Sequence, residues 1–317
     1  MRQRQTKPVV FCIDVEPDER MFDPSGPPPP WLGFERFVER LPRLRERLAE
    51  STGRPVAVSW FLRMDEQVER TWGSREWAAG KYGEVLDGLV RDGDGLGLHT
   101  HPWRWDEGKG DWYAEYTDTA WAVASIDSAI DAFERSFGRP CEAHRGGDHH
   151  LSGAMLERLG GRGVRVDLTV EPGQRPGGAV RGEASHGTGA DYRRVPREPY
   201  RSSAQRFPSP DPRGGDPLLI PLTSALGSRR FGRTPIPPDA SPARFIPRLE
   251  VELLGATWAP PVLAFAVRSD APLGPRWDAL ERNLMHLTRR HDVEFVSTTG
   301  VLEQVERLVG SIPAAVG

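Results

Sequence analysis

The sequence has few cysteines, no long apolar run and no excess of charge of one sign. Cys12 and Cys141 are the only cysteines in 317 residues, too few for a disulfide framework, so we expect a reducing, cytoplasmic setting. No stretch approaches the ~20 apolar residues of a membrane span, and the apolar run before Asp14 is too short for a signal-peptide core. The 42 basic and 45 acidic residues give a net charge of −3 without a basic cluster. We therefore expect neither a membrane nor a nucleic-acid partner.

Short apolar runs alternate with longer amphipathic stretches along the whole chain. The predicted strands are Pro8–Ile13, Pro55–Leu62, Gly95–Leu98, Cys141–His144, Val164–Leu168, Pro217–Pro221, Pro261–Val267 and Val293–Val296. The predicted helices are Phe34–Glu50, Lys81–Arg91, Thr117–Phe137, Ser152–Leu159, Ser241–Leu254, Pro275–Arg290 and Gly300–Val309. This alternation predicts an α/β fold with seven or eight mostly parallel strands, closed or nearly closed into a barrel. The length fits one such domain over residues 1–317.

Three segments interrupt this alternation. Asp23–Pro30 is a polyproline-type excursion, Glu171–Asp216 is long and rich in Gly, Pro and Arg, and Gly227–Asp239 is similar but shorter. Each follows a predicted strand. We therefore expect these loops at the C-terminal face of the barrel, where barrel enzymes build their active sites.

The first predicted strand ends in two acids, Asp14 and Glu16. Residues two apart in an extended strand point to the same side. Two adjacent carboxylates repel each other unless a cation or a shared proton compensates their charge. A solvated acidic loop is the alternative interpretation.

His99 and His101 follow the third predicted strand and also share a side. Neutral imidazole nitrogens suit zinc, iron, nickel or copper better than magnesium or calcium. Two ordinary loop histidines are the alternative. Trp103 lies just beyond and could stack on a ligand, although core packing explains a tryptophan more often than ligand stacking does.

A third motif, Ala143–His150, reads AHRGGDHH. Its glycines allow a close approach of backbone to a ligand, and Arg145 offers a planar fork for an oxyanion. Asp148 is a candidate substrate contact. His149 and His150 are candidate ligands or general acids, or exposed polar residues before the next helix.

Three more strands deliver charged residues. Arg63 and Asp65 end the second strand, where a substrate contact and a salt bridge at the rim are both consistent with the sequence. Arg268 and Asp270 repeat this design on a late strand. Asp167 lies inside an apolar run and needs a partner such as Arg145 or a protonated imidazole.

The order of these motifs resembles the polysaccharide deacetylase superfamily, also called carbohydrate esterase family 4 or the nodulation-type deacetylase homology domain. The resemblance extends motif by motif from Pro8 to about Val309 and implies a distorted (β/α) barrel with a metal ion, usually zinc. It implies that Asp14 is the general base, that Glu16 and His99 bind the metal, and that Arg145 orients the base. Asp167 matches the acid of the fourth motif.

Two departures from the family pattern bear on the chemistry. The family places its metal histidines four apart, whereas here the second histidine is His101 and position 103 is Trp. Arg268 stands where the family has the histidine that acts as general acid. The candidates for that role are His149, His150 and Asp270.

These observations predict a metal-dependent hydrolase that removes an acyl group, N-acetyl before O-acetyl, from an amino sugar or a related small molecule. One divalent ion is expected at Glu16, His99 and His101: zinc first, with iron, cobalt or nickel as alternatives. Arg145 or Arg268 would stabilise the developing oxyanion. Two other hypotheses are a non-haem iron enzyme, which uses the same donor set, and a binding protein on a degenerate scaffold.

Overall fold

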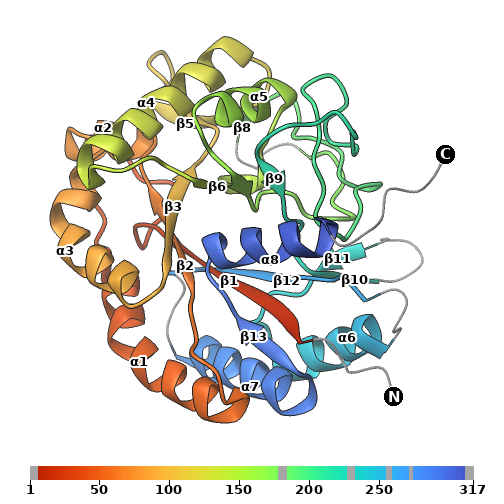
Figure 1. Cartoon of the computed structure of the whole chain (residues 1–317). Helices are drawn as coiled ribbons and strands as arrows, with labels where there is room; N and C mark the ends of the chain where they lie inside the picture. The colour runs from red at the N-terminus through yellow and green to blue at the C-terminus, as the bar shows by residue number, and fades with distance from the viewer. Residues whose placement is uncertain (1–5, 178–183, 227–232, 255–258, 271–273, 311–317) are drawn as a thin grey trace.

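The computed structural model describes residues 6–177, 184–226, 233–254, 259–270 and 274–310. Its centre is a curled sheet of eight strands in the order β12-β1-β2-β3-β6-β7-β9, with β13 also paired to β1 (Figure 1). Every pairing in this sheet is parallel. The strands are β1 (Lys7–Val15), β2 (Ser59–Arg63), β3 (Gly95–Thr100), β6 (Ala143–Gly146), β7 (Val166–Asp167), β9 (Leu218–Leu219), β12 (Leu263–Arg268) and β13 (Val293–Phe295).

These eight strands coincide with the eight that the sequence predicts, and the predicted distorted barrel is confirmed. The end strands β9 and β12 do not pair with each other as a ladder in the described structure. Instead, Thr223 bridges the gap, since its backbone N–H donates to Ala264 O at 2.8 Å. Its hydroxyl accepts from Ala264 N at 2.9 Å. The barrel is therefore joined at this seam by loop residues.

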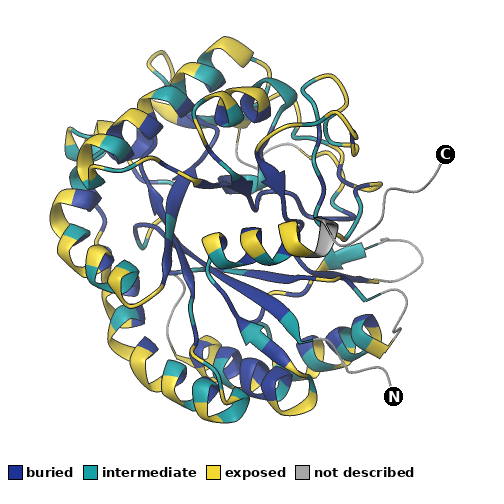
Figure 2. Ribbon diagram, viewed as in Figure 1, coloured by how far each residue is buried: buried dark blue, intermediate teal, exposed yellow. Residues whose placement is uncertain are grey.

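Eight described helices accompany the sheet, and all but the last of them lie on its outer side (Figure 1). They are α1 (Leu32–Thr52), α2 (Glu66–Trp72), α3 (Trp77–Arg91), α4 (Thr119–Phe137), α5 (Gly153–Gly161), α6 (Pro242–Leu254), α7 (Pro275–Arg290) and α8 (Thr298–Gly310). Figure 2 shows buried strands and helices whose outward faces are exposed. Seven of these helices match the predicted ones, and α2 is the addition. No described helix combines the length and apolarity that a membrane crossing requires.

The eighth helix, α8, fills the N-terminal end of the barrel (Figure 1). Its Val301, Leu302 and Val305 belong to the same buried cluster as Val10 and Cys12 of β1. The alternate residues of β1 pack outward under the helices. Because the side chains of a strand alternate between its faces, Asp14 and Glu16 continue the inward row begun by Val10 and Cys12. The inner surface is thus apolar at one end and acidic at the other.

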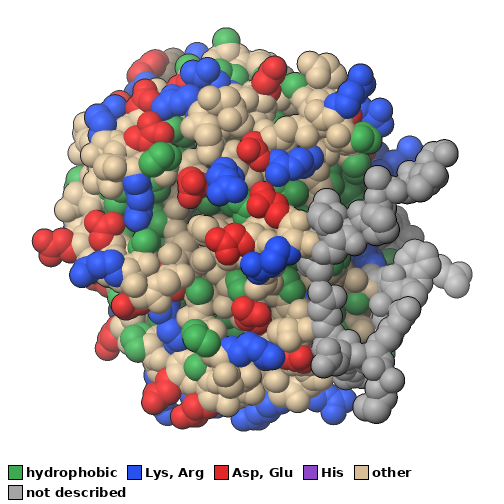
Figure 3. Space-filling model, in the orientation of Figure 1, with side chains coloured by type: hydrophobic (Ala, Val, Ile, Leu, Met, Phe, Trp, Pro, Cys, Tyr) green, Lys and Arg blue, Asp and Glu red, His purple; other side chains and the backbone are tan. Residues whose placement is uncertain are grey.

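Smaller elements cover the C-terminal face. The strands β4 (Trp103–Asp106) and β5 (Asp111–Glu115) form a hairpin, and β8 (Ala184–His186) pairs with β5. The strands β10 (Ser224–Leu226) and β11 (Arg233–Pro235) pair with each other, and η1 (Gly147–His149) is a short 3-10 turn. The segments expected to be irregular therefore contain short strands, and parts of them, residues 178–183 and 227–232, lie outside the described residues. On the face shown in Figure 3, acidic and basic side chains are interspersed.

Candidate metal centre and cavity

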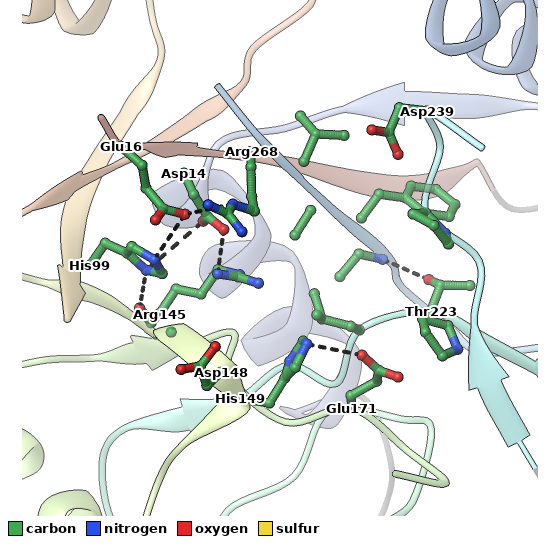
Figure 4. Close-up of a pocket in the computed structure, with 18 of the residues that line it drawn as sticks. Asp14, Glu16, His99, Arg145, Asp148, His149, Glu171, Thr223, Asp239 and Arg268 are labelled. Carbon is green, nitrogen blue, oxygen red and sulfur yellow. Dashed lines mark hydrogen bonds and ion pairs between the residues drawn. The ribbon is translucent and has the colours of Figure 1, made fainter. Parts of the chain in front are cut away.

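Glu16, His99 and His101 converge at the C-terminal end of the barrel, where β1 and β3 end. Figure 4 shows Glu16 and His99 beside each other. His101 Nε2 lies 3.2 Å from Glu16 Oε2, and His99 Nε2 lies 3.6 Å from Glu16 Oε1. The two Nε2 atoms are 3.1 Å apart. Within the described chain, this is the set of three candidate ligands whose atoms lie within 4.8 Å of one another. The structure thus brings together the three residues predicted to bind metal.

The ring of His99 is oriented for coordination through Nε2. Its Nδ1–H donates to Arg145 O at 2.6 Å, which leaves a lone pair on Nε2. Burial lowers the pKa of His99, against the nearby carboxylate of Asp14, and so favours the neutral imidazole that a metal requires. The donor set of two imidazoles and one carboxylate fits a divalent transition metal or zinc.

Glu16 is buried among cations. Arg268 Nε lies 3.2 Å from its Oε1, and Arg63 Nη1 lies 3.5 Å from its Oε2. Burial alone would raise the pKa of Glu16, but Arg268 and His101 hold it well below its usual range. The side chain is therefore an ionised carboxylate at neutral pH.

His101 has a more crowded environment than His99. Its Nδ1 accepts the indole N–H of Trp103 at 2.8 Å, and Asp148 Oδ2 lies 3.6 Å from the same atom. Burial and Arg63 oppose a charge on the ring, but Glu16 and Asp148 outweigh them and raise the pKa of His101. Gly147 makes room for this ring, since a Cβ at that position would lie 2.4 Å from it.

Asp14 lies beside the three candidate ligands and is held by Arg145. Arg145 Nη1 donates to Asp14 Oδ2 at 2.5 Å, and both side chains are buried. The second oxygen, Oδ1, is buried without a hydrogen-bond partner. It is therefore free to accept a proton from a molecule in the cavity.

Arg63 and Asp65 lie behind the candidate ligands. Both are completely or almost completely buried, and Arg63 Nε donates to Asp65 Oδ2 at 2.9 Å. Asp65 also caps the start of α2 and accepts the backbone N–H of His101 at 3.0 Å. Together with the buried Trp103, they support the ligands and do not line the cavity. The expectation that these three residues touch substrate is corrected accordingly.

Two consecutive residues of η1 have backbone conformations that side chains rarely adopt. Asp148 has φ 52° and His149 has φ 53°. Such strain persists where the surroundings impose it, and it is common at functional sites. Asp148 pairs with Arg20 and is held ionised, because Arg20 and His101 lower its pKa against the effect of burial. The strained turn presents both side chains to the cavity.

His149 lies next to Glu171 in the wall of the cavity (Figure 4). His149 Nε2 lies 3.2 Å from Glu171 Oε2, and its Nδ1 lies 3.2 Å from Thr169 O. Both ring nitrogens therefore face oxygen acceptors. His150 differs: burial lowers its pKa to about 4, and it does not line this cavity.

Asp167 lies on the other face of the sheet, which corrects its assignment to the catalytic set. Its neighbours Val166 and Leu168 point into the barrel, so Asp167 points outward. It accepts from His144 Nδ1 at 2.7 Å, and His144 Nε2 lies 3.0 Å from Thr100 Oγ1. The imidazole partner expected for this acid is thus His144, which the sequence did not identify.

Arg268 lines the cavity, whereas Asp270 does not. Arg268 Nη2 donates to Asp270 Oδ2 at 2.5 Å, so the acid anchors the arginine. Burial, opposed by Arg268 and reinforced by Glu16, raises the pKa of Asp270 to about 6. Asp270 is therefore placed behind the site and not against a substrate.

The cavity above these residues has a volume of about 300 Å³. Its floor is the charged cluster, and its far wall is the β12 edge with the segment around β11. The lining residues that the sequence did not single out include Arg20, Glu171, Ile236, Asp239 and Arg276. Each of them lies in a loop or at a helix start, where one sequence gives no periodic signal.

Comparisons with known proteins identify solved structures that share the fold of this chain. No family model and no curated protein matches the sequence. Among solved structures, a protein assigned as a polysaccharide deacetylase from Mycobacterium smegmatis is similar, with a TM-score of 0.54, 16% identity and coverage of 98% of this chain and 93% of that one. A protein assigned as a polysaccharide deacetylase from Pseudomonas aeruginosa PAO1 is similar with a TM-score of 0.53 and 18% identity, and the match covers 95% of this chain and 91% of that one. The allantoinase Puue is similar with a TM-score of 0.54 and 15% identity, and the match covers 95% of this chain and 90% of that one.

These similarities extend over almost the whole chain. They show that it has the polysaccharide deacetylase fold, as the order of motifs in the sequence predicts.

Proposed function

We propose that this protein is a metal-dependent hydrolase that removes an acyl group from the nitrogen of an amino sugar or a related small molecule. The convergence of Glu16, His99 and His101 beside the Asp14–Arg145 pair, on the floor of a cavity, carries the proposal. Structures of the same fold are assigned as deacetylases, which supports the reaction class.

Glu16, His99 and His101 would hold one divalent ion, zinc in the first place. When bound, such an ion supplies Lewis acidity, which polarises a carbonyl and acidifies water. A count of charge favours a cation here: Arg20, Arg63, Arg145 and Arg268 each pair with another carboxylate. Glu16 is the fifth acid of the cluster, and the two arginines beside it, Arg63 and Arg268, also pair with Asp65 and Asp270.

Asp14 would act as the general base. Its unpartnered Oδ1 takes one proton from water, whose oxygen bonds to the acyl carbon. Arg145 keeps the other oxygen occupied and so fixes the direction of the free one. Arg268, on the other side of Glu16, stabilises negative charge as it develops on the acyl oxygen.

His149 would supply the proton that the leaving nitrogen needs when the C–N bond breaks. It lines the cavity, and its ring nitrogens lie 3.2 Å from Thr169 O and from Glu171 Oε2. This assigns the general acid to the turn after β6, because the family's usual position is occupied by Arg268. The products are a carboxylic acid and an amine.

The test combines metal analysis with product release. Purified protein should contain about one metal ion per chain and release acetate from an N-acetylated amino sugar or its oligomers. His99→Ala and Glu16→Gln should lose both properties, whereas His286→Ala, on the remote helix α7, should keep both. Full metal occupancy in His99→Ala would contradict the ligand assignment.

A second candidate function rests on the donor set itself. Two histidines and one carboxylate also bind iron in non-haem oxygenases. Iron in the purified protein, together with oxygen consumption, would favour this alternative. Zinc with acetate release would exclude it, and ligand binding without turnover of any acylated amine would favour a binding protein.

A further inference from the structure

The inward-facing side chains of β12 change from charged to small along the strand. Arg268 is in register with Asp14 of β1 at the C-terminal end of the barrel. Ala266 and Ala264 precede it in the same row: Ala264 belongs to the inner cluster and Ala266 packs against it, whereas Phe265 belongs to the outer cluster. The row that brings Arg268 to the cavity therefore continues into the barrel as two methyl groups.

The cavity occupies the room that these alanines leave. Ala264, Ala266 and Arg268 all line it, so its wall follows β12 over four residue steps, roughly 13 Å of strand. Leu222 and Ile236, which are both buried, line it as well. We call Leu222, Ile236, Ala264 and Ala266 the apolar stretch. It adjoins Arg268, because Ala266 precedes Arg268 in the same inward row.

The backbone polar groups of Ala264 are already engaged by Thr223. The Thr223 N–H donates to Ala264 O at 2.8 Å, and its hydroxyl accepts from Ala264 N at 2.9 Å. The charged side of the cavity is separate: Figure 4 shows Asp148, His149 and Glu171 along one side, with Arg268 across from them. The cavity thus has an apolar stretch that begins beside Arg268 and a charged side that includes His149.

We infer that the apolar stretch holds the carbon chain of the acyl group, and that the preferred substrates carry an N-acyl group longer than acetyl. The inference rests on the proposed function and names its substrate class. In that reaction Arg268 faces the acyl oxygen and His149 faces the leaving nitrogen. The acyl chain therefore extends along β12, and the hydrophilic amine lies on the charged side. An acetyl group has a single methyl and fills only the start of the stretch.

An ion pair limits the length of the chain that the cavity accepts. Asp239, three residues after Ile236, pairs with Arg276, and both side chains line the cavity. Asn283 Nδ2 holds the turn around Asp239 by two hydrogen bonds to backbone oxygens, each of 2.7 Å. A long apolar chain would have to desolvate this pair, at a cost in free energy. Chains of intermediate length, such as butyryl, should therefore bind best.

The substrate test compares N-acetyl-, N-butyryl- and N-hexanoylglucosamine, which release the same amine, with the zinc-loaded protein. Burial of each methylene is worth roughly fourfold, so kcat/KM for the butyryl compound should exceed that for the acetyl compound by about 15-fold. The hexanoyl compound should gain less than a further factor of about 15, because its chain reaches the Asp239–Arg276 pair. A kcat/KM that is equal for acetyl and butyryl, or higher for acetyl, would overturn the inference and leave deacylation itself intact.

Two variants and a control locate the effect. Ala266→Leu fills the apolar stretch and should bring the butyryl-to-acetyl ratio of kcat/KM towards one. Ile236→Ala widens the stretch and should raise the hexanoyl-to-butyryl ratio, which keeps the inference testable if Ala266→Leu does not fold. Ala49→Leu adds the same side chain at a half-buried position of α1, on the outer side of the sheet, and should leave both ratios unchanged. Ratios that stay the same in Ala266→Leu and Ile236→Ala would place the acyl chain elsewhere and overturn the inference.

A binding measurement gives a readout that does not need turnover. Calorimetric titration of the zinc-loaded protein with the product acids should give butyrate an affinity about 15-fold above that of acetate, and equal affinities would overturn the inference. Methyl and hexyl glycosides of N-acetylglucosamine test the opposite orientation. A kcat/KM that rises with the glycoside chain and not with the acyl chain would assign the stretch to the amine part and overturn the inference. Failure to release amine from any N-acyl substrate, with butyrate still bound more tightly than acetate, would contradict the proposed function alone.

Discussion

The two ends of the barrel interior are built from the same strands but from opposite kinds of side chain. At the N-terminal end, Val10 and Cys12 pack against Leu302 and its neighbours on α8. At the C-terminal end, the same row of β1 continues as Asp14 and Glu16, which are buried and paired with arginines and histidines. The packed end makes a rigid base, and on that base the other end can hold buried charges in one geometry.

The largest difference between the two ends is expected in catalysis. Asp14→Asn removes the proposed base, so kcat should fall by about 10²- to 10⁴-fold while the fold persists. The matched control is Cys12→Ala, one step lower in the same inward row. It should lower stability and leave kcat unchanged. Equal activity losses in both variants would mean that the two ends do not differ in role.

The reverse experiment is Leu302→Ala in α8, which deletes buried methyl groups from the packed end. The free energy of unfolding should fall by about 2–5 kcal/mol, the usual cost of a large-to-small change in a core. Denaturant titration measures this effect. Zinc affinity of the folded fraction should stay the same, and a joint loss of affinity would show that the packed end shapes the metal site directly.

Zinc should stabilise the charged end specifically. At 100 times its dissociation constant, a ligand that binds only the native state adds about 2.7 kcal/mol to the free energy of unfolding. We expect this increment in the unchanged protein and in Leu302→Ala, and its absence in His99→Ala. A thermal melt with and without zinc measures it, and stabilisation that persists in His99→Ala would place the ion elsewhere.

The smallest effect is expected at the rim, at Glu115. Burial would raise its pKa, but hydrogen bonds from Thr117 and Asp118 and the contact with His186 lower it to about 2. Because the pKa of Glu115 is lower in the folded state than in the unfolded state, the ionised acid stabilises the fold at pH values above the unfolded-state pKa. This contribution disappears as the pH falls towards 2. Glu115→Gln should therefore cost about 1 kcal/mol near neutral pH, with a difference that shrinks below about pH 4. A difference that is independent of pH would rule out this origin.

Much of the fold was predictable, because continuous apolar runs mark strands that are covered on both faces. The same runs explain the misplacement of Asp167. Val166 and Leu168 are apolar, and so is most of the sheet on both sides, so the sequence does not reveal which face Asp167 takes. Spacing within β1 and β3 placed Asp14, Glu16, His99 and His101 on one side, and the structure agrees.

The sequence did not show which charged and aromatic residues line the cavity and which lie behind its wall. Arg63, Asp65 and Trp103 are chemically suited to contact a substrate, but they lie behind the ligands. The hairpin of β4 and β5 had a local signal, since Trp103 and Trp105 alternate with polar residues before a glycine-containing turn. Glu171 and Asp239 had none, because their positions depend on loop paths.

The position of α8 has a consequence for how the chain is made. The inner cluster joins residues from Val10 to Val305, so every residue through Val305 must leave the ribosome before that cluster can close. Until then, the inward row of β1 lacks its cover. We expect a nascent barrel that stays open and needs protection from aggregation until α8 has left the ribosome and packs against β1.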